Sequence, residues 1–153
     1  MILYSNHGAM KLKLNVDVLN DDFFEETRLL GITAPVKSYQ FCLMLNNQLG
    51  FNFRMNADYE IHLRKKERSY YFSVYQSNEP NSFLSHFLYH NQFDGEYLLP
   101  EFKHMDFLWL MKGDTVDDEK CEWIKQAVRG LNGVQLVAEL TNEQIKNKGN
   151  MIL

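Results

Sequence analysis

The chain has 153 residues, of which 45% are hydrophobic and 24% charged, as is ordinary for one globular domain. Its net charge of -4 argues against a general binder of polyanions, because affinity for a phosphate backbone needs concentrated Lys and Arg. No apolar run approaches the roughly 20 residues needed to cross a bilayer, so neither nucleic acid nor a membrane is expected among the partners.

The N-terminal part of the chain carries the first strand signal. In residues 10–18, Leu and Val alternate with Lys, Asn and Asp, which is the period of a half-buried strand. Polar residues interrupt the apolar start of the chain at once, so no export signal is expected and the predicted location is cytoplasmic. Residues 1–9 are predicted to be an extension or alternative start, 10–140 a single domain and 141–153 a C-terminal tail in which 146–150 fray.

Helix signals follow. Asn20, Asp21 and Asp22 favour a short helix or irregular turn in the segment that runs to Gly31. A capping Thr33 with Pro35 behind it, and Gly50 at the other end, bracket residues 36–49 as a helix. A strand over residues 40–45 is the competing interpretation, since periodicity does not separate the two in a short apolar run.

The middle of the chain is rich in strand signals. Five segments dense in Tyr, Phe and Leu are separated by short polar links: 51–55, 59–63, 70–75, 83–91 and 105–112. Links this short predict antiparallel neighbours, because a parallel crossover needs about a dozen residues or more. We therefore expect a meander.

A second helix begins after Thr115, where three acidic residues at 117–119 complement the helix dipole. Its apolar stripe includes Cys121, Ile124 and Leu131, and a closing strand is predicted over residues 134–140. The fold class predicted is α+β, an antiparallel meander sheet of about six strands with two main helices. One helix precedes the meander and the other lies between its last two strands.

Residues 99–107 read Leu-Pro-Glu-Phe-Lys-His-Met-Asp-Phe. This stretch resembles the signature I-P-E-x-x-x-V-D-Y of the IPExxxVDY family of small bacterial proteins, and the resemblance extends over roughly residues 10–140. It implies no activity, because the family has none assigned. Leu99 and Met105 keep the size and apolarity of the signature, whereas Phe107 lacks the hydroxyl of its Tyr.

Two interpretations of the signature stay open. In the structural one, Pro100 fixes a turn, Glu101 accepts backbone N–H bonds across it and Asp106 pairs with a Lys or Arg on a neighbouring strand. In the functional one, Glu101 and Asp106 line a surface that binds a partner or ligand, with His104 beside them.

Other residue clusters favour structural interpretations. His86 and His90 would lie about 13 Å apart on a strand at ~3.3 Å per residue, too far to share a metal ion. The basic residues at 64–68 fall where a hairpin turn belongs. Cys42 and Cys121 have no metal-type spacing and are expected to be reduced, inert core thiols.

No nucleophile elbow, phosphate loop or zinc-protease motif occurs in the sequence. We expect a non-catalytic protein without cofactor or metal that acts through protein contacts, with an unidentified partner or as a homodimer. The alternative is a small-molecule-binding domain whose apolar pocket is anchored by Glu101, His104 or Asp106. An enzyme that uses Glu101 and Asp106 as acid and base is a third hypothesis.

Overall fold

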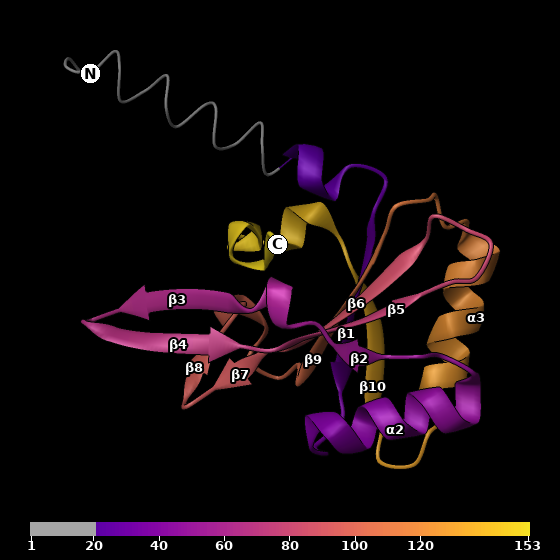
Figure 1. Cartoon of the computed structure of the whole chain (residues 1–153), viewed down its shortest axis with the longest axis horizontal. Helices are drawn as coiled ribbons and strands as arrows, with labels where there is room; N and C mark the ends of the chain where they lie inside the picture. The colour runs from indigo at the N-terminus through magenta and orange to yellow at the C-terminus, as the bar shows by residue number, and fades with distance from the viewer. Residues whose placement is uncertain (1–20) are drawn as a thin grey trace.

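A six-stranded antiparallel sheet organises residues 21–153, the part of the chain that the computed structural model describes (Figure 1). The strand order is β10-β1-β9-β6-β5-β2. The strands of this sheet are β1 (Arg28–Thr33), β2 (Arg54–Met55), β5 (Val74–Asn78), β6 (Ser85–His90), β9 (Phe107–Lys112) and β10 (Leu136–Leu140). Two hairpins lie outside it, formed by β3 (Ile61–Lys65) with β4 (Arg68–Phe72) and by β7 (Gln92–Phe93) with β8 (Glu96–Tyr97).

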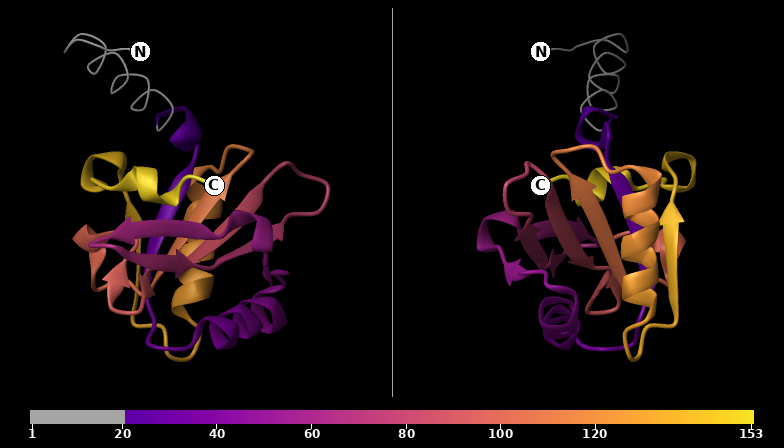
Figure 2. Two further views of the ribbon diagram at one scale, coloured as in Figure 1. Left: turned by 60° about the vertical axis from the view of Figure 1, so that its left-hand side comes forward. Right: turned by 90° about the vertical axis from the view of Figure 1, so that its right-hand side faces the viewer.

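The sheet is covered on both faces. The helices α2 (Ser38–Leu49) and α3 (Asp118–Arg129) pack on one face, and the β3–β4 hairpin and the C-terminal segment pack on the other (Figures 1 and 2). Four short 3-10 turns complete the fold: η1 (Ala57–Tyr59), η2 (Pro100–Phe102), η3 (Asn142–Gln144) and η4 (Lys148–Met151). The predicted α+β class, with about six antiparallel strands and two main helices, is confirmed.

Both helices occur where the sequence predicts them. Gly50 ends α2 in the left-handed region at φ 78°, and Asp117 caps α3 by accepting a hydrogen bond from the backbone N–H of Lys120 at 2.8 Å. The expected cap at Thr33 is wrong. Thr33 is the last residue of β1 and its hydroxyl donates to the carbonyl of His104, so α2 begins only at Ser38.

Strand β1 was not predicted as a strand. The sequence favoured a short helix or turn running to Gly31, whereas only residues 21–24 are helical and Arg28–Thr33 pairs with both β9 and β10. Leu29, Leu30 and Ile32 are all buried, because a central strand covered on both faces has no polar side to show. Its apolar run therefore lacks the alternation that identifies a strand. The strand predicted at residues 10–18 lies outside the described residues.

The C-terminal segment packs against the sheet rather than fraying at 146–150 as expected. Met151 is completely buried, and the Tyr89 hydroxyl donates to its carbonyl at 3.0 Å. Ile145 is also buried in the same cluster. These apolar anchors on either side of the polar stretch hold it in place.

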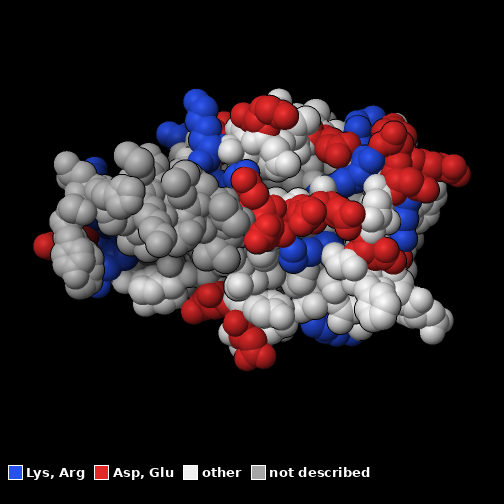
Figure 3. All heavy atoms as spheres, turned by 90° about the horizontal axis from the view of Figure 1, so that it is seen from above, with Lys and Arg blue, Asp and Glu red and all other residues white. Residues whose placement is uncertain are grey.

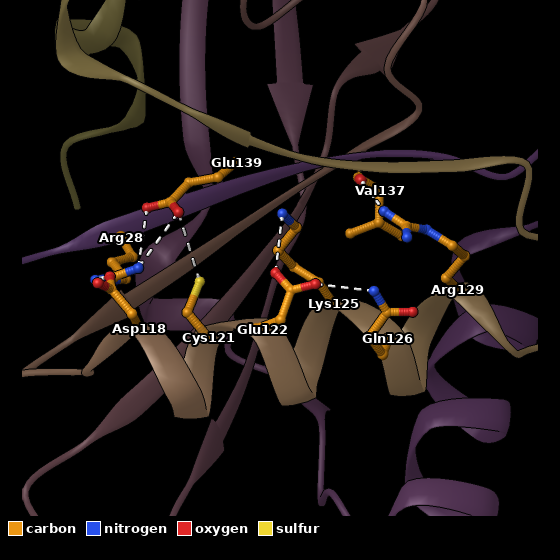
Figure 4. A network of polar contacts seen from close by, with 9 residues as sticks. All are labelled: Arg28, Asp118, Cys121, Glu122, Lys125, Gln126, Arg129, Val137 and Glu139. Atoms are coloured by element: carbon orange, nitrogen blue, oxygen red, sulfur yellow. Dashed lines mark hydrogen bonds and ion pairs between the residues drawn. The ribbon is translucent and has the colours of Figure 1, made fainter.

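A polar network fastens α3 to the sheet beside it (Figure 4). Arg28 of β1 forms ion pairs with Asp118 of α3 and with Glu139 of β10. At the other end of the helix, the Arg129 guanidinium donates to the Val137 carbonyl at 3.0 Å. Both ends of α3 are thereby tied to β10, one of the two edge strands of the sheet.

Candidate functional site

The signature segment binds other parts of the chain. Pro100 begins η2, and the Glu101 carboxylate accepts hydrogen bonds from the backbone N–H groups of Lys146 at 2.6 Å and Asn147 at 2.7 Å. The Asn147 side chain donates to its other oxygen at 2.9 Å. Burial would raise the pKa of Glu101, but these hydrogen bonds outweigh it and the pKa is lowered. Glu101 thus holds the C-terminal segment.

Asp106 binds a different part of the chain from Glu101. Its carboxylate accepts from the backbone N–H of Ala34 at 2.8 Å, and its own N–H donates to the Ile32 carbonyl at 2.8 Å. Its partner is thus a backbone amide, not the Lys or Arg of our structural interpretation. His104 is exposed, and Phe107 is buried against Phe41 with ring centroids 4.6 Å apart.

Asn91 organises the signature segment from beneath and was not recognised in the sequence. Its side chain is fully buried and donates to the carbonyls of Phe102 at 2.9 Å and Met105 at 3.0 Å. It also accepts from the backbone N–H of Leu99 at 2.8 Å. Since these partners follow it by 8 to 14 positions, no local pattern marks its role.

A cleft of about 690 Å³ lies elsewhere, where the end of α2, the face of α3 and the end of β5 meet. Its apolar wall consists of Leu49, Phe51, Trp123 and Ile124. Its polar lining includes Asn52, Ser77, Asn78, Glu79 and Lys120. None of the signature residues lines this cleft.

A chain of polar contacts runs from the core to the cleft. The indole N–H of Trp109 donates to His86 Nδ1 at 2.9 Å, which leaves the proton of the neutral ring on Nε2. That nitrogen donates to Glu79 Oε2 at 2.7 Å, and Glu79 Oε1 accepts from the Lys120 ammonium at 2.6 Å. Trp109 and His86 are completely buried, whereas Glu79 and Lys120 line the cleft.

The electrostatics of these polar contacts favour a neutral His86 ring beside the ion pair of Glu79 and Lys120. Burial lowers the pKa of His86, although the neighbouring Glu79 opposes the effect. For Glu79, burial would raise the pKa, but the hydrogen bonds from Lys120 and His86 outweigh it and the pKa is lowered. The cleft therefore presents a carboxylate supported from behind by an uncharged imidazole.

Ser77 is a second buried polar residue at the cleft. It is 4% exposed, and its hydroxyl oxygen accepts from the backbone N–H of Asn52 at 2.9 Å. Among the described residues, the only buried polar side chains are Ser77, His86 and Asn91. Two of these three therefore lie in or directly behind one cleft.

The sequence did not single out the residues of the cleft. Lys120 and Trp123 were seen only as parts of a helix, and Glu79 as part of a turn. One signal was present in the sequence, since Trp123 falls off the apolar stripe of α3. In the structure its side chain is 58% exposed, which is unusual for so large an apolar side chain. His86 and His90 lie on β6, the strand predicted for them.

Within residues 21–153, no group of three or more His, Cys, Asp or Glu side chains is arranged to hold a metal ion. No helix in the same range is both long and apolar enough to span a bilayer. The sequence matches no family model and no curated protein. The resemblance to the IPExxxVDY family therefore stays a prediction.

Proposed function

We propose that this protein is a non-catalytic binding protein that takes a small molecule into the cleft between α2, α3 and β5. The observation that carries the proposal is the polar chain from Trp109 through His86 to Glu79, which ends in a hollow of about 690 Å³. Buried polar groups are costly unless they are fully bonded. His86, buried behind Glu79, and Ser77, buried in the lining, are the kind of support that positions a binding group.

The size and lining of the cleft support this proposal. Ligand pockets are usually hollows of roughly 300–1,000 Å³ with mostly apolar walls and a few polar groups that fix orientation. Here Trp123 and Phe51 offer aromatic surface, while Glu79, Asn52 and Asn78 are among the polar groups of the lining. The pocket anticipated from the sequence had Glu101, His104 or Asp106 as anchors, and the proposed site replaces it.

A fragment screen followed by amide and indole NMR tests the proposal. The chain has 2 Trp residues, and only Trp123 lines the cleft, so its indole signal should shift on binding while that of buried Trp109 shifts less. Trp123→Ser should weaken every hit. Leu43→Ser, an exposed apolar position on α2 away from the cleft lining, is the matched control. Hits that perturb only other surfaces would contradict the proposal.

Protein contacts are the second candidate function, with an unidentified protein partner or a second copy of the chain. The observation that favours them is the set of large apolar side chains left exposed, with Phe83 at 86% and Met55 at 61%. Light scattering of the purified protein and of Phe83→Ser tests self-association. A monomer at all concentrations would argue against a homodimer.

The free, buried thiols of Cys42 and Cys121 support a cytoplasmic location within either proposal.

A further inference from the structure

We propose that the cleft selects an organic cation, a protonated amine attached to an apolar body, with Glu79 as the counter-ion. This inference rests on the proposed function and names its ligand class. The recognising groups are the Glu79 carboxylate and the aromatic wall formed by Trp123 and Phe51.

Glu79 is already arranged to receive an ammonium group. Its Oε1 accepts from the Lys120 ammonium at 2.6 Å, so a primary ammonium fits against this carboxylate. Each carboxylate oxygen has two acceptor sites, and each Glu79 oxygen has one described donor. The Glu79 side chain is 24% exposed, so a further acceptor site is accessible from the cleft.

His86 fixes the position of that carboxylate. Its ring is completely buried and is bonded on both sides, to Trp109 and to Glu79, so rotation of the ring would break both contacts. The neutral ring donates to Glu79 without cancelling its negative charge. Glu79 is thus held in place and keeps its negative charge, which a ligand cation would share with the Lys120 ammonium.

The rest of the cleft also favours positive charge. Leu49 and Gly50, which line it, form the C-terminal end of α2, where the helix dipole is negative and no basic residue lies in the last turn. The faces of Trp123 and Phe51 can attract a cation through their π electrons. The one basic residue in the lining, Lys120, is already paired with Glu79.

An anionic ligand would meet the opposite situation. It would have to approach Lys120 beside the Glu79 carboxylate and close to the acidic first turn of α3, which contains Asp118 and Glu119. Figure 3 shows acidic side chains over the molecular face seen from above, with Lys and Arg side chains between them. Charge complementarity therefore favours an amine over a carboxylate of the same shape.

Three probes of similar shape and different charge test the ligand class: 2-phenylethylamine, 2-phenylethanol and 3-phenylpropionate. They are titrated near neutral pH into the full chain while the Trp123 indole signal is followed by NMR. We expect the amine to bind about tenfold more tightly than the alcohol, the size of effect typical of one charge-assisted hydrogen bond, and the carboxylate to bind most weakly.

Variants assign the preference to Glu79. Glu79→Gln should remove the advantage of the amine over the alcohol, and Glu122→Gln, an exposed carboxylate on α3 outside the cleft lining, should keep it. Lys120→Met should strengthen amine binding several-fold, because it removes the internal competitor. If Glu79→Gln fails to fold, the order of the three probes on the unchanged protein and the Lys120→Met result still decide.

The outcomes separate this inference from the proposed function. Equal binding of amine and alcohol, tighter binding of the carboxylate, or loss of amine binding in Lys120→Met would overturn the cation assignment while the cleft remains a binding site. If none of the three probes and no fragment moves the Trp123 signal at millimolar concentration, both the assignment and the proposed function are overturned.

Discussion

At the scale of single residues, Asp106 ties two segments of the backbone together. Its carboxylate accepts from the N–H of Ala34, which leads out of β1 toward α2. That task needs an acceptor but not a negative charge. We therefore expect Asp106→Asn to change the free energy of unfolding by less than about 0.5 kcal/mol, and Asp106→Ala to lower it by about 1–3 kcal/mol through the lost partner.

Urea unfolding followed by fluorescence measures both changes at one pH. A direct comparison of the two variants isolates the hydrogen bond, since they share the loss of charge. If Asp106→Asn were as destabilising as Asp106→Ala, the charge itself would matter, and a cation or ligand near Asp106 would have to be sought.

The two thiols give a prediction about reactivity. Burial raises the pKa of Cys42 to about 12 and also raises that of Cys121, where Arg28 partly opposes the effect. Because the thiolate is the nucleophile, both should react with a disulfide reagent at neutral pH far more slowly than a free thiol. Rapid reaction of both is expected once the chain is unfolded in urea. A fast-reacting thiol in the native protein would show that its helix opens locally.

At the scale of elements, Gly113 fixes where the loop between β5 and β6 lies. It follows β9 with φ 108°, and a Cβ there would lie 2.1 Å from the carbonyl oxygen of Phe83. That oxygen is backbone, so the clash is not relieved by a side-chain rotation. We expect Gly113→Ala to lower the free energy of unfolding by about 2 kcal/mol or more.

The same variant should disturb the cleft, because the loop beside Phe83 begins with Glu79 and Pro80, which line it. Thermal unfolding measures the stability change, and the Trp123 indole signal reports on the cleft. Gly130→Ala is the control, since a Cβ there would meet nothing closer than 3.5 Å. Equal stability of the two variants would mean that the loop shifts without cost.

The helices were predictable because their ends carry local signals, Asp117 before α3 and Gly50 after α2. Strand β1 was missed because it is buried on both faces and its apolar residues do not alternate. The predicted strand at 70–75 is divided between β4 and β5 around Ser73, since β4 leaves the main sheet to pair with β3. Such a division depends on tertiary pairing, which no local pattern encodes.

The signature segment and the cleft also differ in how far local sequence could predict them. In one of the two interpretations left open by the sequence, Glu101 accepts backbone N–H bonds across its own turn, whereas the donors, in Lys146 and Asn147, lie in the C-terminal segment. The cleft is assembled from Leu49, Glu79 and Trp123, which are far apart in the chain and meet only in the fold. Its residues carry no common motif, so no local pattern groups them.

For the molecule as a whole, the buried His86 and the half-buried His90 link the fold to pH. His86 contacts Glu79 and Trp109, and Lys120 lies beyond Glu79, whereas His90 stacks on Phe107 near Asp106. Burial lowers the pKa of both rings below the ordinary 6.5. The unfolded chain therefore binds protons on these residues at a pH where the folded chain does not.

The sign of the resulting pH dependence follows from linkage. Above about pH 6.5, the ordinary His pKa, both states are neutral at these rings and their stabilising contribution is fully present. As the pH falls below that value toward the lowered pKa of the folded state, the unfolded state gains protons first, so the free energy of unfolding decreases. Glu79, whose pKa is also lowered, adds a further loss at more acidic pH.

Urea unfolding at about pH 8 and about pH 5.5 measures this decrease. His86→Gln should be less stable at the higher pH, because the amide does not reproduce both ring contacts, and should lose less stability between the two pH values. His104→Gln is the matched control: His104 is exposed, so the variant should keep the pH dependence of the unchanged protein. If His86→Gln retained the full pH dependence, the acid sensitivity would arise from His90 or elsewhere, and the neutral ring assigned behind Glu79 would lose its support.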